Sequence, residues 1–141
     1  MSDSIDRVTG VVDETATVIA CSDLTRIGET LEYLLLGSGD WDYEQFFLAM
    51  QGRYPGKVGV TIGFDAALSR RVYAGADLFL MPSATEPCGL AQMIAMRYGT
   101  VPIVRKTGGL RDTVIDVGDG GCGYTFETYN AHDMLGAIKR A

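Results

Sequence analysis

The sequence is poor in the two residue types that most often bind metal ions or cross-link small domains. It contains one histidine, His132, and three cysteines, Cys21, Cys88 and Cys122, in 141 residues. An odd number of widely spaced cysteines suits neither a disulfide framework nor a zinc site. We therefore expect no bound metal, and three separate thiols in a reducing compartment.

Long apolar runs and an excess of positive charge are also missing. No stretch approaches the ~20 apolar residues that cross a bilayer, and residues 1–13 have the character of neither a secretory signal nor a transit sequence. The net charge is −6, whereas a nucleic-acid-binding surface needs clustered Lys and Arg. Neither a membrane nor a nucleic acid is therefore an expected partner. A small anion is not excluded, because backbone N–H groups at a helix start bind phosphate in acidic proteins too.

Apolar runs alternate with candidate helices from about residue 17 to the end of the chain. This alternation is typical of a Rossmann-like α/β fold, here with a mostly parallel six-stranded sheet and helices on both faces. The predicted strands are residues 17–21, 33–36, 58–62, 78–81, 101–104 and 123–126. The predicted helices are residues 42–51, 65–74, 90–98, 110–116 and 131–140.

The first connection of this predicted sheet is unusually short. Only residues 22–32 separate the first two strands, which is close to the minimum of ~10–12 residues for a parallel crossover. We expect at most a short helix there. Residues 1–15 are predicted to be a frayed lead-in, and residues 16–141 to form one domain.

Residues 78–90 predict a buried strand, a polar loop and a helix opened by Gly89. In open parallel sheets, ligands bind beyond the carboxyl ends of the strands, where the N–H groups of the following helix attract negative charge. Gly89 would let a phosphate approach the backbone closely. The Glu86 carboxylate could contact sugar hydroxyls or stabilise positive charge at an anomeric carbon. Simple capping of the helix is the alternative role for Glu86.

A second glycine turn, Thr107-Gly108-Gly109, follows the next predicted strand. Two adjacent strand ends would present backbone donors to one crevice, which suits a diphosphate. An ordinary strand-to-helix turn is the alternative. Arg105 and Lys106 lie just upstream and either supply positive charge to this crevice or form a solvated pair.

An aromatic cluster occupies the predicted helix of residues 42–51 and its start. Trp41, Tyr43, Phe46 and Phe47 could stack on carbohydrate. Their helical spacing favours the alternative, that they form one buried face of the helix.

Several consecutive motifs resemble the C-terminal half of bacterial glycogen synthases and plant starch synthases. They run in order from about residue 17 to the end, and several motifs in order are more specific than any one glycine turn. The segments are GVTIGFD (59–65), YAGAD (73–77), PS (82–83), EPCGL (86–90), RYGTVP (97–102), TGGL (107–110) and DTV (112–114).

This resemblance implies the C-terminal half of a two-Rossmann glycosyltransferase fold. In that family the C-terminal domain binds ADP-glucose as the donor substrate, and the N-terminal domain reaches the growing α-1,4-glucan. Transfer retains the anomeric configuration and uses no metal or other cofactor. Localisation would follow the source, in the cytoplasm of a bacterium or the plastid stroma of a plant or alga.

Carried over position by position, the resemblance implies roles for nine residues. Glu86 corresponds to the family's catalytic glutamate at the donor glucose. Phe64 falls where the family usually has an adenine-stacking tyrosine, and it keeps the stacking face of that ring; composition alone would make it a core aromatic. The remaining donor-binding positions, which include backbone N–H groups for the diphosphate, are Gly63, Cys88, Gly89, Leu90, Thr107, Gly108 and Gly109.

Three positions depart from the family pattern. Asp23 stands where the family has an arginine, Gly28 where it has a lysine, and Ala91 where it commonly has a threonine. Loss of the arginine and lysine contacts should weaken diphosphate binding by roughly 1.5 to 3 kcal/mol each. Arg26 could compensate in part, although it is out of register with the family's cations.

Two functions follow as alternatives. The chain is either a donor-binding domain that needs a complementary N-terminal synthase domain, or a catalytically inactive nucleotide-binding or regulatory module. Exposed apolar surface should lead to association with that domain or to self-association, and we expect no glucan synthesis by the isolated chain. A thiol enzyme based on Cys88 is disfavoured, since His132 lies far along the chain.

Overall fold

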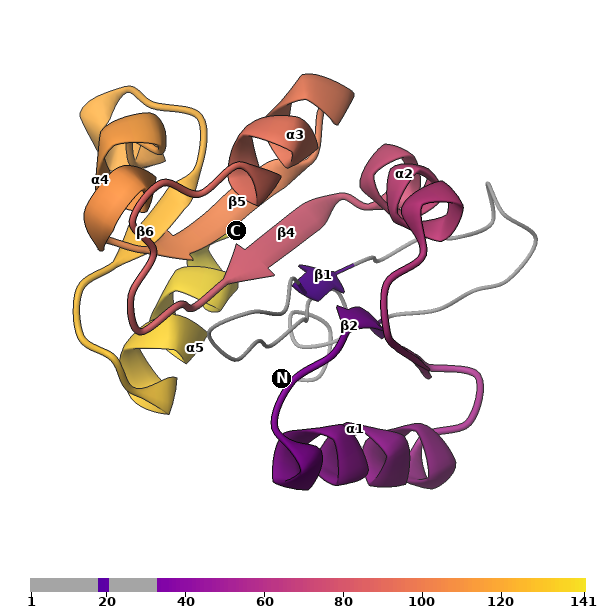
Figure 1. The fold of residues 1–141 in the computed structure, drawn as a ribbon. Helices are drawn as coiled ribbons and strands as arrows, with labels where there is room; N and C mark the ends of the chain where they lie inside the picture. The colour runs from indigo at the N-terminus through magenta and orange to yellow at the C-terminus, as the bar shows by residue number, and fades with distance from the viewer. Residues whose placement is uncertain (1–17, 21–32) are drawn as a thin grey trace.

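The structure, a computed structural model, describes residues 18–20 and 33–141, the first three by their backbone alone. Figure 1 shows strands and helices alternating along most of this part of the chain. The strands are β1 (Val18–Ala20), β2 (Tyr33–Gly37), β3 (Val58–Ile62), β4 (Leu78–Met81), β5 (Val101–Arg105) and β6 (Tyr124–Phe126). The helices are α1 (Trp41–Arg53), α2 (Ala66–Gly75), α3 (Ala91–Tyr98), α4 (Gly108–Thr113), the 3-10 turn η2 (Val117–Asp119) and α5 (Ala131–Arg140).

The predicted α/β class is confirmed, because parallel strands carry helices on both faces. β2 pairs with β3, β4 with β5, and β5 with β6, all in parallel. A single six-stranded sheet is not confirmed, since the described ladders form two three-stranded sheets, β1-β2-β3 and β4-β5-β6. β1 lies close to β4, so the two sheets adjoin.

β1 runs antiparallel to β2, which differs from the rest of both sheets. The connection between them, residues 21–32, is near the shortest that a parallel crossover allows. An antiparallel neighbour has no such requirement. The short connection is therefore compatible with the reversed direction of β1.

Alternation along β4 directs its side chains into two apolar clusters. Phe79 and Met81 pack on one face with residues of α2, α3 and α4, together with Leu34 of β2, so the two sheets share this core. Leu78 and Leu80 pack on the other face against α5. All four residues of β4 are buried, so this strand lies at the centre of the core, beside the candidate site.

The helix predicted at residues 110–116 differs from the observed helix at both ends. The predicted helix of residues 110–116 is observed as α4, which starts at Gly108 and ends at Thr113, because Asp116 is extended and caps η2 through its side chain. Cys88 and Cys122 are exposed and unpaired.

The buried helical face predicted for the aromatic cluster is wrong. α1 has no buried residue, and Trp41, Tyr43 and Phe46 are 68%, 59% and 54% exposed. In Figure 1 this helix stands apart from the others. It contacts β3, whose own residues are only half-buried or exposed. No second layer of described residues covers its outer side, so helical spacing alone does not bury these rings.

None of the helices in residues 33–141 is long and apolar enough to cross a membrane.

Candidate functional site

Two glycine loops meet beyond the carboxyl ends of β4 and β5. We call residues 86–90 the first glycine loop and residues 107–110 the second glycine loop. β4 and β5 are parallel neighbours, so the segments that follow them reach the same edge of the sheet. The N–H group of Gly109 donates to the carbonyl oxygen of Glu86 at 3.0 Å. The predicted convergence of the two loops is therefore present in the structure.

Both glycines of the second loop are required by this contact. A Cβ atom on Gly108 would collide with the carbonyl oxygen of Glu86, and one on Gly109 with that of Cys88. Gly108 also has a φ of +43°, in the left-handed region that disfavours side chains. The two loops thus pack backbone against backbone.

Glu86 is half-buried, and its carboxylate contributes to the loop itself. Oε1 of Glu86 accepts a hydrogen bond from the Gly89 N–H at 3.0 Å. This is the capping contact that the sequence leaves as an alternative role. Within the described residues the second carboxylate oxygen, Oε2, has no hydrogen-bond partner. One oxygen holds the loop, which leaves the other to interact with a ligand.

Gly89 serves internal packing as well as the turn. Its φ is +67°, and a Cβ atom there would lie 2.7 Å from Nε2 and Oε1 of Gln92 and 2.9 Å from Cδ2 of Leu110. The missing Cβ thus points into the protein. These contacts give a packing reason for glycine at position 89. They do not test the predicted close approach of a phosphate.

Gln92, which the sequence reasoning missed, lies beneath the first loop. Its side chain is fully buried, and Nε2 donates to the Gly89 carbonyl oxygen at 2.6 Å and to Oγ1 of Thr113 at 2.9 Å. The only signal available was a glutamine one helical turn before the inward-facing Ala95.

Three further predicted donor-binding residues, Cys88, Leu90 and Thr107, lie on the two glycine loops and are exposed or half-buried. Gly63 and Phe64 lie elsewhere, after β3. Leu90 is 64% exposed, and its N–H group has no acceptor in the described part of the chain. Cys88 is exposed, and Thr107 is the N-cap residue of α4 without a side-chain capping bond.

Phe64 follows the other sheet, at the end of β3. It is 87% exposed, so the core position that composition alone suggests is wrong, and its ring is free to stack. Gly63 precedes it with a φ of +111° and donates to the carbonyl oxygen of Gly37 at 2.7 Å. No ring contact or hydrogen bond among the described residues joins Phe64 to either glycine loop.

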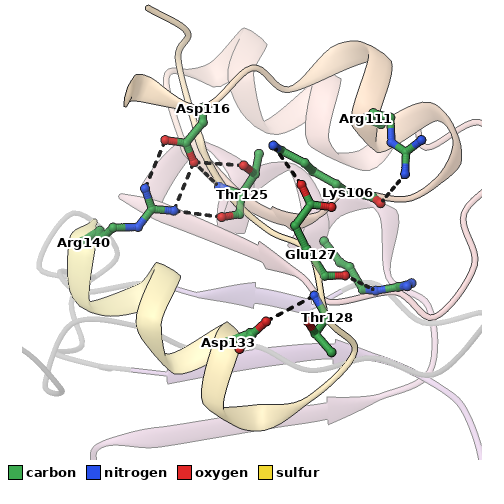
Figure 2. A network of polar contacts seen from close by, with 9 residues as sticks. Lys106, Arg111, Asp116, Thr125, Glu127, Thr128, Asp133 and Arg140 are labelled. Atoms are coloured by element: carbon green, nitrogen blue, oxygen red, sulfur yellow. Dashed lines mark hydrogen bonds and ion pairs between the residues drawn. The ribbon is translucent and has the colours of Figure 1, made fainter. Parts of the chain in front are cut away.

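Arg105 and Lys106 are neither a solvated pair nor free cations. Arg105 donates from Nη1 to the carbonyl oxygen of Ala84 at 2.7 Å and from Nε to that of Glu127 at 3.1 Å, and its guanidinium lies over the Tyr129 ring. Lys106 forms an ion pair with Glu127 at 3.1 Å, which Figure 2 shows. Both cations thus tie together the ends of the strands beside the site.

A separate polar network lies around Asp116 (Figure 2). Its carboxylate accepts hydrogen bonds from Arg140, from the N–H and hydroxyl of Thr125, and from the Gly118 N–H. The Arg140 guanidinium, followed by these other donors, holds the pKa of the Asp116 carboxyl well below its usual range. Among the described residues no contact of Asp116 or Arg140 reaches the glycine loops, so we assign this network to stability.

Two of the three departures from the family pattern, Asp23 and Gly28, lie outside the described residues, as does Arg26. Ala91 is the first residue of α3 and brings no hydroxyl to the helix start. His132 is exposed beside Asp133 and far from Cys88 in the chain. Among residues 33–141 no group of three His, Cys, Asp or Glu side chains is placed to hold a metal ion.

The amino-acid sequence was compared with protein families and with curated proteins. The sequence profile of the family described as "Glycosyl transferases group 1" matches residues 17–141. The chain is 55% identical over 127 residues to a glycogen synthase of Geobacillus thermodenitrificans, covering 88% of the chain and 26% of that protein. It is 57% identical over 118 residues to a glycogen synthase of Anoxybacillus flavithermus, covering 82% of the chain and 24% of that protein.

A solved structure has a similar fold. The catalytic domain of starch synthase IV from Arabidopsis thaliana, bound to ADP and acarbose, superposes with a TM-score of 0.71 at 40% identity, covering 76% of this chain and 24% of that one. The resemblance to glycogen and starch synthases is thus confirmed, although this chain spans about a quarter of the length of these proteins. Since the family profile matches almost the whole chain, the chain belongs to the glycosyl transferases group 1 family.

Proposed function

We propose that this glycogen/starch synthase-like domain binds ADP-glucose as the donor half of a retaining α-1,4-glucan synthase. The observation that carries the proposal is the backbone contact between the two glycine loops, which keeps Glu86 at the carboxyl ends of β4 and β5. The similar starch synthase IV structure was solved with ADP. A nucleoside diphosphate is therefore the ligand class to test first.

The chemistry of the loops suits each part of such a donor. The unbonded N–H of Leu90, with those of the first turn of α3, would donate to the diphosphate. The second glycine loop, from Thr107 to Gly109, would close the other side. The free Oε2 of Glu86 would face the glucose ring, where a carboxylate stabilises positive charge developing at the anomeric carbon. Phe64, after the turn at Gly63, would stack on the adenine, and Cys88 would line the donor pocket.

This proposal assigns no cofactor and no metal to the domain. The acceptor α-glucan and the closure that excludes water would come from a complementary N-terminal synthase domain. The exposed apolar residues of α1 make association with that domain, or self-association, the expected state in solution. Cytoplasm in a bacterium, or plastid stroma in a plant or alga, is the matching compartment.

Calorimetric titration of the purified chain with ADP, ADP-glucose and UDP-glucose tests the proposal. We expect saturable binding of ADP-glucose that Gly89→Val abolishes, because this side chain would displace Gln92 and Leu110. Gly136→Ala, at an open position on α5, serves as the control and should bind like the parent chain. Failure of the folded parent chain to bind any of the three ligands would overturn the proposal.

A catalytically inactive nucleotide-binding or regulatory module is the second candidate, favoured by Ala91, which lacks the hydroxyl that the family commonly places there. The two functions differ in activity after complementation. Glucose incorporation into glycogen should be undetectable for the chain alone. It should appear on mixing with an N-terminal glycogen synthase half if the first candidate is right, and stay absent if the second is right.

A further inference from the structure

Gln92 is the least expected residue near the site. It lies on the inward side of α3, and its side chain is fully buried. Both Nε2 protons are used, toward the carbonyl oxygen of Gly89 and toward Oγ1 of Thr113. Its Oε1 is buried and has no hydrogen-bond partner in the described part of the chain. An apolar side chain of the same length would fill this space without an unpaired acceptor, so packing does not explain the glutamine.

The contacts of Gln92 complete a closed circuit between the two glycine loops. Oε1 of Glu86 accepts from Gly89, whose carbonyl oxygen accepts from Gln92. Gln92 donates to the Thr113 hydroxyl, which donates to the Gly109 carbonyl oxygen at 2.7 Å. The Gly109 N–H returns to the carbonyl oxygen of Glu86. The circuit begins and ends on the residue whose carboxylate would face the sugar.

One peptide group of this circuit carries a proposed ligand contact. The carbonyl oxygen of Gly89 and the N–H of Leu90 belong to the same planar peptide. In a trans peptide these two groups point in opposite directions, and the described chain contains no cis peptide. Because Gln92 binds the carbonyl oxygen from the interior, the Leu90 N–H is turned away from the interior.

We propose that Gln92, acting through Thr113, is a positioning residue that fixes the Glu86 carboxylate and the Leu90 N–H for the donor. Gln92 itself is buried and does not touch the ligand. The inference rests on the proposed function for its effect on donor binding, whereas its effect on the loops is independent of any ligand. Thr113, in the DTV segment that follows the glycine turn, is the relay between the two loops.

The test uses Gln92→Met, which keeps the length of the side chain, removes both donors and also removes the unpaired acceptor. Thr113→Val removes the relay with a smaller change of shape. Gln45→Met places the same substitution on the exposed surface of α1 as a control. Each variant is compared by thermal unfolding, by amide hydrogen exchange measured with NMR, and by titration with ADP-glucose.

We expect the Gly89 and Gly109 amides to exchange at least ~10-fold faster in Gln92→Met and Thr113→Val, with the amides of α5 unchanged. ADP-glucose affinity should fall by a similar factor, and Gln45→Met should match the parent chain in both measurements. In Gln92→Glu, binding should recover as the pH falls, because the protonated carboxyl group can again donate to the Gly89 carbonyl oxygen. Gln92→Met carries no ionisable group at this position and should show no such recovery.

The outcomes separate this inference from the proposed function. If the parent chain does not bind ADP-glucose while the two loop amides still loosen selectively, the proposed function fails and the positioning role stands. If exchange at Gly89 and Gly109 is unchanged in a folded Gln92→Met chain, the inference is overturned. The inference would also be overturned if amide exchange became faster throughout the Gln92→Met chain while exchange at Gly89 and Gly109 stayed unchanged in a folded Thr113→Val chain.

Discussion

Arg140 forms a bidentate ion pair with Asp116, in which Nη1 and Nη2 each lie 3.1 Å from a carboxylate oxygen. Nη2 also donates to the Thr125 carbonyl oxygen at 2.8 Å. The last residue of α5 is thereby tied to β6 and to the start of η2. Because Ala137 and Ile138 of α5 pack against the β4-β5-β6 sheet, this contact secures that side of the core.

Asp116→Ala should lower the free energy of unfolding by about 2 to 4 kcal/mol. The substitution leaves the buried donors of Thr125 without an acceptor and removes the ion pair with Arg140. Denaturant titration would measure the loss. Asp112→Ala, at an exposed carboxylate on α4, should change stability by less than about 0.5 kcal/mol. Equal effects of the two substitutions would show that the contacts of Asp116 contribute nothing.

The same carboxylate predicts how stability depends on pH. The pKa of Asp116 is lowered in the folded chain from an ordinary value of 3.8. The unfolded state therefore takes up a proton first, and the stabilisation present above about pH 4 is lost as the pH falls further. One such group changes the free energy of unfolding by at most ~1.4 kcal/mol per pH unit. The decline below pH 4 should be shallower in Asp116→Asn than in the parent chain; identical slopes would refute this origin.

Gly109→Ala should separate the two glycine loops. The added methyl group would collide with the backbone at Cys88, so the loops must move apart, at a cost of about 2 to 4 kcal/mol. Thermal unfolding and ADP titration should both report the damage. Gly136→Ala is the matched substitution in open space within a helix, and it should be neutral or stabilise by up to ~1 kcal/mol. A Gly109→Ala chain with parental stability and affinity would contradict the packing described.

Phe64→Ala should affect ligand binding and leave stability unchanged. The ring is almost fully exposed and supports no core, whereas stacking of an aromatic ring on a base contributes roughly 1 to 3 kcal/mol. ADP affinity should therefore fall by about 5- to 150-fold with no shift in unfolding temperature. Phe64→Tyr keeps the stacking face and should bind like the parent chain. Parental affinity in Phe64→Ala would remove this residue from the adenine site.

Phe46→Ser on α1 should reduce self-association without loss of fold. The side chain is more than half exposed, so the free energy of unfolding should change by about 0.5 kcal/mol or less. Sedimentation velocity at several concentrations would detect the change in association. A monomeric parent chain, with no difference in the variant, would show that the exposed rings do not mediate self-association.

The amino-acid sequence by itself determined most of the helices and strands and indicated the family. Apolar runs placed β3, β4 and α5 at their observed bounds, because buried strands and an amphipathic helix each impose a period on the sequence. The order of the motifs indicated the family, and the glycine turns indicated that two loops meet at one edge. Each of these features depends on residues close together in the sequence, so it can be predicted without the folded structure.

Only the tertiary structure decided which of these residues face inward and what they touch. The helical spacing of Trp41 and Phe46 predicts a buried face, yet burial requires a second layer that the described residues do not provide over α1. Gln92, Thr113 and Asp116 looked unremarkable in the sequence, because their roles depend on partners up to 24 residues away. A Cβ atom on Gly89 would meet Gln92 and Leu110, which is a packing reason for glycine that the sequence does not reveal. The period of apolar residues predicts which face of a helix or strand is turned toward the core. Hydrogen bonds and steric collisions depend on distances between segments that only the folded chain brings together.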